Sequence, residues 1–264
     1  MGHYLRRLAG LPLRRVSQGL RARRLLASGR RYHLVLLQLS FDASMQVHSD
    51  YRSSAQFAGD CIEAFARGAS GENCLVFKSH PFEDGRERLG RVIAAAAERL
   101  GVDDRVLFLD GGPSLSSLLD GARSVVTVNS TAAQQALWRG LPVAALGRAV
   151  YAKPGLVSSQ ALDAFFANPR RPDQQAYWQF RQFLAETSQL VGSFYSRPGI
   201  AALLEALPAA MLAPVDPYDR VLAAAPASEP VATPLPALAA QLTATRPPAP
   251  AEMREGPQPH RLAV

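Results

Sequence analysis

The stretch SVVTVNSTAAQQALWRGLPVAAL, residues 124–146, holds the pattern that decides the fold. Its two ends, 124–128 and 142–146, are short and nearly continuous apolar runs, which are typical of strands buried on both faces of a parallel sheet. The segment between them, 131–139, predicts a short helix that closes at Gly140. A strand, a helix and a second strand in this order form one crossover unit, and such units are right-handed in parallel sheets.

The same alternation of apolar runs and helical periods extends toward the N-terminus. Three more candidate strands lie at 33–39, 74–78 and 105–109, with one helix at 53–67 and another that Gly101 stops. The predicted inward faces of these helices consist of Phe57, Cys61, Ile62 and Phe65 in the first, and Leu89, Val92, Ile93, Ala96 and Leu100 in the second. This pattern predicts a doubly wound parallel α/β sheet, in the manner of a Rossmann fold, followed by a helical C-terminal part.

Composition divides the chain into three regions. The 264 residues carry a net charge of +7, but residues 1–31 hold nine arginines and no acid, so subtracting +9 leaves −2 for all the rest. Residues 32–212 are rich in apolar runs and form the expected folded domain. Residues 213–264 contain eleven of the twenty prolines and much alanine, which predicts a disordered tail.

Residues 1–31 are interpreted as a basic arm or linker, with two other roles open. Leucines interleaved with the arginines would suit an amphipathic segment on an anionic membrane surface. Basic patches also bind nucleic acid, but no aromatic residue stands between Arg6 and Arg31 to stack on bases, which disfavours that role.

Several absences point to a cytoplasmic protein. The arm lacks the apolar core and cleavage site of a signal peptide, and the chain has no uncharged apolar run of about 20 residues. Two cysteines, Cys61 and Cys74, are too few for a disulfide framework, so a reducing compartment is the simpler interpretation.

Two polar clusters follow predicted strands, where ligands bind in open α/β sheets. The first is Lys78-Ser79-His80-Pro81, directly after 74–78. Lys78 supplies a positive charge, His80 an imidazole that can donate to a phosphate oxygen, and Pro81 fixes the turn between them and the next segment. The alternative is an exposed loop with no binding role.

The second cluster, Asn129-Ser130-Thr131, follows 124–128 and opens the expected helix 131–139. A hydroxyl at this position is ordinarily a helix N-cap. The same helix end also presents free N–H groups and a positive dipole to an anion. The sequence has no Walker A, G-x-G-x-x-G, G-x-S-x-G, H-E-x-x-H or C-x-x-C motif, so we expect no metal and no resident cofactor.

Together with their surroundings, these clusters resemble the capsule polysaccharide biosynthesis/export family. The resemblance runs in consistent order over roughly 32–197, with 1–31 and the tail outside it. It is carried by LQLSFDASMQVHSDY at 37–51, LVFKSHP at 75–81, DRVLFLD at 104–110, VVTVNSTAAQQALWRGLPVAALGRAVYAKPGL at 125–156 and QLVGSFY at 189–195.

The resemblance implies a Kdo-transferase-like glycosyltransferase of the two-domain GT-B type, which moves Kdo from the donor CMP-Kdo to a lipid-linked acceptor. Its partners would be the nucleotide sugar, that acceptor at the inner face of the inner membrane, and capsule assembly or export proteins, but no nucleic acid. A departing CMP develops negative charge, which Lys78, His80 and a helix N-terminus are suited to stabilise. The implied nucleotide-sugar-binding residues are Lys78, His80, Pro81, Asn129, Ser130, Thr131 and Gln38.

Two departures from the family pattern bear on catalysis. Ala133 stands where the family usually has glycine, and the acidic E-E-G-Y-L-R-P-like segment expected upstream is not in the sequence. A sugar transfer needs a group that deprotonates the acceptor hydroxyl. Asp42 and Asp50 are candidates by position, although Asp50 would equally serve as a helix cap. The catalytic residue therefore stays unknown, and we expect a donor-binding half that lacks the N-terminal domain.

Two other functional classes stay open at this point. One is a non-catalytic binding or assembly module of the capsule export machinery, which the missing acceptor-side segment favours. In the other class, the function lies in the arginine arm, which would recruit the protein to anionic lipid.

Overall fold

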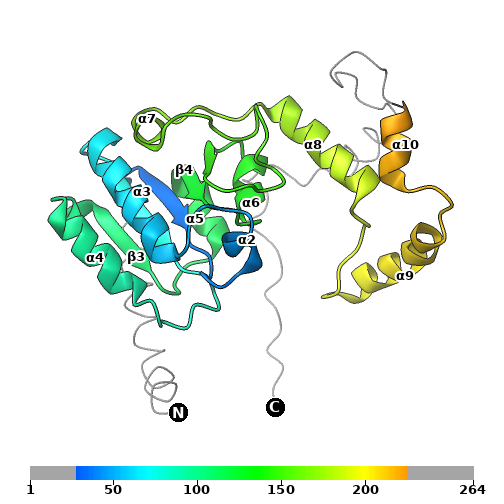
Figure 1. Ribbon diagram of the computed structural model, residues 1–264, viewed down its shortest axis with the longest axis horizontal. Helices are drawn as coiled ribbons and strands as arrows, with labels where there is room; N and C mark the ends of the chain where they lie inside the picture. The colour runs from blue at the N-terminus through cyan, green and yellow to red at the C-terminus, as the bar shows by residue number, and fades with distance from the viewer. Residues whose placement is uncertain (1–27, 225–264) are drawn as a thin grey trace, which may run out of the picture. The chain divides into compact units, whose positions relative to one another are not determined.

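The computed structural model describes residues 28–224, and its first compact unit, up to Trp178, is built on a five-stranded sheet (Figure 1). All strands are parallel and their order is β3-β2-β1-β4-β5. This confirms the doubly wound parallel α/β sheet. The strands are β1 (Tyr32–Leu36), β2 (Cys74–Lys78), β3 (Val106–Leu109), β4 (Ala122–Thr127) and β5 (Val143–Ala145).

Helices connect the strands and cover the sheet (Figure 1). α3 (Ser54–Gly68) and α4 (Leu89–Arg99) pack against each other, and α7 (Leu162–Ala167) packs on α3. α5 (Leu115–Gly121) contacts α6 (Ala133–Trp138) and β1. Two short elements complete the unit: α2 (Ala43–Gln46) and the 3-10 turn η1 (Asp103–Arg105).

The core lies between the sheet and its helices, largely where the apolar periods place it. β1 is buried along its whole length, and so are the four predicted inward residues of α3. On α4, Leu89, Ile93 and Ala96 are buried, but Val92 is 38% exposed, so its assignment to the inward face was wrong. α4 ends in a Schellman motif: Val102 N–H donates to Ala97 O, and Gly101 takes the left-handed conformation.

Several element boundaries differ from the predicted ones. β1 stops at Leu36 rather than 39, and beyond its end the Gln38 side chain accepts a hydrogen bond from Asn129 N–H. α5 was not predicted, although Ser114 caps it and Leu118 and Leu119 form its buried face. The expected helix 131–139 shortens to α6, whose N-cap position, Ala132, offers no side-chain cap.

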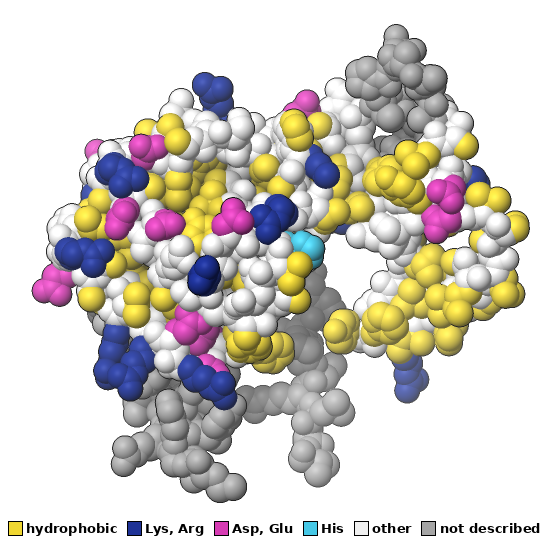
Figure 2. All heavy atoms as spheres, viewed as in Figure 1, with side chains coloured by type: hydrophobic (Ala, Val, Ile, Leu, Met, Phe, Trp, Pro, Cys, Tyr) yellow, Lys and Arg dark blue, Asp and Glu magenta, His cyan; other side chains and the backbone are white. Residues whose placement is uncertain are grey.

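The second compact unit begins at Gln179, within α8 (Gln174–Thr187), and contains α9 (Arg197–Met211) and α10 (Pro217–Ala224). α10 lies where a disordered tail was predicted. Pro217 occupies its first position, Asp216 accepts a hydrogen bond from Tyr218 N–H, and the Tyr218 ring packs on Phe183 at 5.8 Å. Apolar side chains of α9 and its flanks lie at the surface (Figure 2), among them Leu204, Met211 and Leu212.

Parts of the predicted organisation lie outside the described residues. These are nearly all of the arginine arm and the tail from residue 225 onward. Among the helices of residues 28–224, none combines the length and the apolar character needed to cross a membrane.

One imidazole is enclosed by the core of the first unit. His33 lies in β1 with no exposed surface, its Nδ1 is 2.7 Å from Ser124 Oγ, and its ring packs edge-on against Phe166. Burial, helped by the charge of Arg123, lowers the pKa of His33 from 6.5 to about 3. The folded protein therefore holds this ring neutral at pH values where the unfolded chain protonates it.

We predict that His33 makes stability depend on pH. Below about pH 6 the unfolded state binds the extra proton, so the free energy of unfolding falls with decreasing pH by up to about 1.4 kcal/mol per unit. Urea denaturation at several pH values between about 6 and 4 should show this slope, and His33→Gln should reduce it. His48→Gln, which removes an exposed imidazole, should keep the parent's slope. Equal slopes for parent and His33→Gln would contradict the assignment.

Candidate functional site at the carboxyl edge of the sheet

The two predicted clusters meet at one edge of the sheet, on either side of its central strand. Leu36, the last residue of β1, pairs with Lys78 of β2 on one side and with Thr127 of β4 on the other. Strands lie about 4.8 Å apart, so these two flanking positions are separated by about 10 Å. The chain reverses its direction of winding between β1 and β4, and open α/β sheets bind ligands at this switch point.

Lys78 is half-buried at the end of β2 and reaches toward the loop after β3. Its Nζ donates to Gly111 O at 2.8 Å, while Ser79 Oγ donates to Asp110 Oδ1 at 3.2 Å. Burial lowers the pKa of Lys78, and nearby Asp110 acts in the opposite direction. One hydrogen bond leaves an ammonium with two further protons, so Lys78 retains the capacity to donate to an anion.

His80 and Pro81 form the turn that follows. Phe82 N–H donates to His80 Nδ1 at 3.2 Å, which makes Nδ1 an acceptor and assigns the proton of the neutral ring to Nε2. Glu83 N–H donates to His80 O at 3.0 Å and closes the turn, in which Pro81 is exposed. The turn thus fixes the imidazole with Nε2–H as its donor.

Asn129 ties the second cluster to the loop after β1. Its Nδ2 donates to Ser44 O at 2.7 Å and to His48 O at 2.8 Å, and the residue is only 7% exposed. Its backbone N–H donates to Gln38 Oε1 at 2.6 Å, and Gln38 Nε2 donates to Ser44 Oγ. The Gln38 side chain and the Asn129 Nδ2 group therefore hold the 38–48 segment across the switch point, while Asn129 Oδ1 is buried without a hydrogen-bond partner among the described residues.

Ser130 and Thr131 lie in the turn before α6 and do not cap it. Ser130 Oγ accepts from Ala132 N–H at 3.3 Å, and Ser130 N–H donates to Thr127 Oγ1 at 3.3 Å. The interpretation of a hydroxyl of this cluster as the helix N-cap was wrong, because these bonds stabilise the turn instead of the helix. Thr131 is exposed, and the Ser130 hydroxyl still has its own proton to donate.

Three residues that sequence reasoning did not single out support this cluster. Tyr151, whose ring is buried, donates its hydroxyl to Ser130 O at 2.6 Å. A Cβ at Gly147 would lie 2.3 Å from Asn129 Oδ1, so only glycine leaves room for the amide. Arg148 donates to Val47 O at 2.9 Å and anchors the same segment that Asn129 holds. All three belong to the segment 147–151. In the sequence, only the resemblance to the family pointed to this segment as part of the site.

The two candidate bases of the sequence are both engaged in local structure. Asp42 is the N-cap of α2 and accepts from Ser44 N–H at 3.1 Å. Asp50 forms an ion pair with Arg148 at 3.0 Å, whereas the cap of α3 is Ser53. The suggestion that Asp50 caps the following helix was therefore wrong. Within residues 28–224, no three His, Cys, Asp or Glu side chains are grouped to hold a metal ion.

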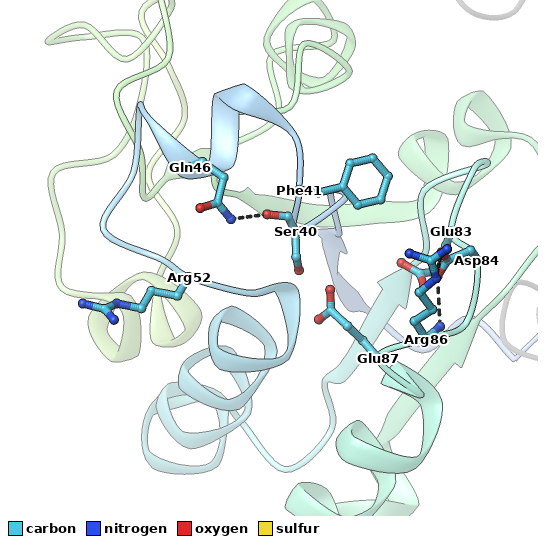
Figure 3. A pocket seen from close by; sticks show the side chains of 8 residues that line it. All are labelled: Ser40, Phe41, Gln46, Arg52, Glu83, Asp84, Arg86 and Glu87. Atoms are coloured by element: carbon cyan, nitrogen blue, oxygen red, sulfur yellow. Dashed lines mark hydrogen bonds and ion pairs between the residues drawn. The ribbon is translucent and has the colours of Figure 1, made fainter.

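A cleft of about 300 Å³ opens next to the His80 turn, between the loop after β1 and the loop after β2 (Figure 3). No predicted site residue lines it. The feature of the sequence that could have pointed to this cleft is the cluster of four charged residues within 83–87, EDGRE, which follows the His-Pro turn. The lining residues are Ser40, Phe41, Gln46, Arg52, Glu83, Asp84, Arg86 and Glu87.

Replacement of Asn129 tests whether this amide holds the switch-point segment. Asn129→Ala leaves the carbonyls of Ser44 and His48 without their donor, which should lower the free energy of unfolding by about 1–3 kcal/mol. Amide hydrogen exchange should accelerate across 38–50 in the same variant. Thr131→Ala, an exposed neighbour, is the matched control and should change neither quantity. If the two variants behave alike, the Asn129 amide does not hold the segment.

Proteins of capsule polysaccharide export and modification are similar to this chain in sequence. The chain is 31% identical to the capsule polysaccharide export protein KpsS of Escherichia coli over 62% of its own length and 42% of that relative. It is 28% identical to the capsule polysaccharide modification protein LipB of Neisseria meningitidis serogroup A over 74% of its own length and 48% of that relative. The chain thus spans less than half the length of these curated relatives.

Among solved structures, the chain is similar to Thermosulfurimonas dismutans KpsC, a beta Kdo 2,7 transferase. The identity is 18%, each chain is covered over 66%, and the TM-score is 0.37. The fold assignment rests on the parallel sheet and not on this likeness.

The family model "Capsule polysaccharide biosynthesis protein" matches residues 2–195. The match takes in the arginine arm, so the expectation that 1–31 lies outside the family was wrong. Almost three quarters of the chain is covered by this match, including both polar clusters. The chain therefore belongs to the capsule polysaccharide biosynthesis protein family.

Proposed function

We propose that this chain is the nucleotide-sugar-binding part of a GT-B type glycosyltransferase in capsule polysaccharide assembly. The donor would be CMP-Kdo and the acceptor a lipid-linked saccharide at the inner face of the inner membrane, alongside capsule assembly or export proteins. The observation that carries the proposal is the pairing of Leu36 with both Lys78 and Thr127. It brings the Lys78–His80 cluster and the Ser130–Thr131 turn to opposite sides of the switch point.

Within this site the residues divide into two kinds. Lys78 Nζ, His80 Nε2 and the hydroxyls of Ser130 and Thr131 retain donors for phosphate oxygens. Gln38, Asn129 and Pro81 act through the backbone they hold and are positioning residues. Donors aimed at a leaving nucleotide stabilise the negative charge that develops when the sugar departs.

A non-catalytic binding module is the second candidate function. It is favoured by one observation: both candidate bases already serve local structure, Asp42 as a helix cap and Asp50 in an ion pair with Arg148. Under this alternative the site would bind the nucleotide sugar without consuming it.

The binding step is tested by titrating the chain with CMP in a calorimeter. We expect saturable binding that His80→Ala and Lys78→Met each weaken by about 10-fold to 100-fold, the contribution of a charge-assisted hydrogen bond. Lys153→Met, which removes the other lysine of the chain at an exposed position, is the matched control. The proposed donor site would be contradicted if the parent did not bind CMP, or if all three variants weakened CMP binding equally.

Turnover separates the two candidate functions. The chain is incubated with CMP-Kdo and a lipid-linked acceptor, and release of CMP together with a product one Kdo heavier is followed by mass spectrometry. The transferase proposal expects both, and expects His80→Ala to lose them in proportion to its weaker donor binding. Product formation identifies the transferase, because a module that only binds the nucleotide sugar cannot transfer Kdo and release CMP.

A further inference from the structure

Phe82 is an exposed phenylalanine on the turn that follows β2. The residue is 79% exposed, and its ring lies beside the imidazole of His80, with 5.7 Å between the two ring centroids. Single exposed hydrophobic residues are common on protein surfaces, so the position of this ring matters more than its exposure. It stands next to a group that the proposed function assigns to the phosphate of a nucleotide.

The turn from His80 to Glu83 holds the imidazole and the phenyl ring in one frame. Phe82 N–H donates to His80 Nδ1 at 3.2 Å, and Glu83 N–H donates to His80 O at 3.0 Å. Pro81, between the two rings, restricts the backbone further. Both hydrogen bonds start from backbone N–H groups, so the turn does not need the Phe82 side chain to close.

The face of the Phe82 ring is open to a ligand. Its plane is inclined by 45° to the plane of the His80 ring, so the two rings do not stack on each other. A flat aromatic ring in this position is suited to a nucleobase, because every base has a π-face. Stacking also needs no hydrogen-bonding group, and a phenyl side chain has none.

The arrangement of the two rings suits the order of groups in a nucleotide. The free donor of His80 is Nε2–H, since Nδ1 accepts from Phe82 N–H. One ribose separates the phosphate of a nucleoside monophosphate from its base, so a phosphate on the imidazole keeps the base within reach of the neighbouring phenyl ring. Ser130 and Thr131, across the switch point, offer hydroxyls for the phosphate but no ring for the base.

We propose that Phe82 is the platform on which the base of the nucleotide sugar stacks. The inference rests on the proposed function, because that function places the phosphate on His80. It adds to the site a residue that the sequence did not single out, and it assigns the base to the β2 side of the switch point. Because stacking does not depend on the hydrogen-bonding edge of the base, Phe82 supplies affinity and not the choice between bases.

The test compares CMP with ribose 5-phosphate, which carries the phosphate but no base. Each is titrated into the ¹⁵N-labelled full chain, and the amide shifts of residues 78–83 and 129–131 are followed by NMR. Phe82→Ala should weaken CMP binding by about fivefold to a hundredfold, the range for removing one base-stacking contact. UMP should weaken by the same factor, and ribose 5-phosphate should bind as it does to the parent.

Further variants separate stacking from simple apolar contact. Phe82→Tyr and Phe82→Trp keep an aromatic face, and they should retain the CMP affinity of the parent within about twofold. Phe82→Leu keeps an apolar side chain without a ring and should behave like the alanine variant. Phe41→Ala is the matched control, because Phe41 is also exposed but belongs to the loop after β1, and it should leave the CMP affinity unchanged.

The ligand itself gives a direct readout of stacking. Protons that lie over the face of an aromatic ring shift upfield, so the H5 and H6 resonances of cytosine should move upfield when the parent is saturated with CMP. The complex of the Phe82→Leu variant should lack this shift. A residue that only supported the turn would not produce it.

The outcomes separate this inference from the proposed function. Loss of CMP affinity in the Ala and Leu variants, with retention in the Tyr and Trp variants, supports the platform even where ribose 5-phosphate binds too weakly to measure. The platform is overturned, and the donor site kept, if Phe82→Ala binds CMP as the parent does, if it weakens CMP and ribose 5-phosphate equally, or if Phe41→Ala has the same effect. A parent chain that binds no CMP contradicts the donor site itself and the platform with it.

Discussion

The central position of β1 is the constraint on which the rest of the site depends. This strand is buried along its length and is bonded on both sides, to β2 and to β4. Because all three strands are parallel, their carboxyl ends open at one edge, and the loops that leave them must share the space above Leu36. The Lys78–His80 turn, the segment after β1 and the Asn129–Thr131 turn are neighbours for this reason, although the chain separates the first and last by about fifty residues.

The place of a residue in a motif and its chemical role are different things in this chain. Asn129 and Gln38 stand among residues that suggest ligand contact, yet the Asn129 Nδ2 group and the Gln38 amide hold the segment after β1. Tyr151 does the same for the turn at Ser130. Of the residues proposed to bind the nucleotide sugar, those with a donor to spare are fewer: they supply an ammonium, one imidazole N–H and two hydroxyls. Preorganisation of this kind is expected where a site must present donors without rearranging.

The sheet could be predicted from the sequence because a strand buried on both faces must be apolar, and the five runs are short and well separated. Helix α3 was equally predictable, because Phe57, Cys61 and Phe65 recur at helical spacing. α5 and α10 were missed, since seven or eight residues give too little periodicity, and their caps at Ser114 and Asp216 were the better signal. The two polar clusters were placed correctly by the rule for strand ends. The cleft was not, because it forms only when two loops forty residues apart pack on the first turn of α3.

The close approach of Asn129 and Gly147 has a consequence for how the family can diverge. A methyl group at 147 would occupy the place of the Asn129 amide oxygen. A smaller side chain at 129 would leave the carbonyls of Ser44 and His48 without their donor, so either change alone is destabilising. A side chain at 147 therefore fits only where residue 129 has changed as well. We expect these two sites, eighteen residues apart, to be inherited as a pair, with substitutions at one accompanied by substitutions at the other among distant members.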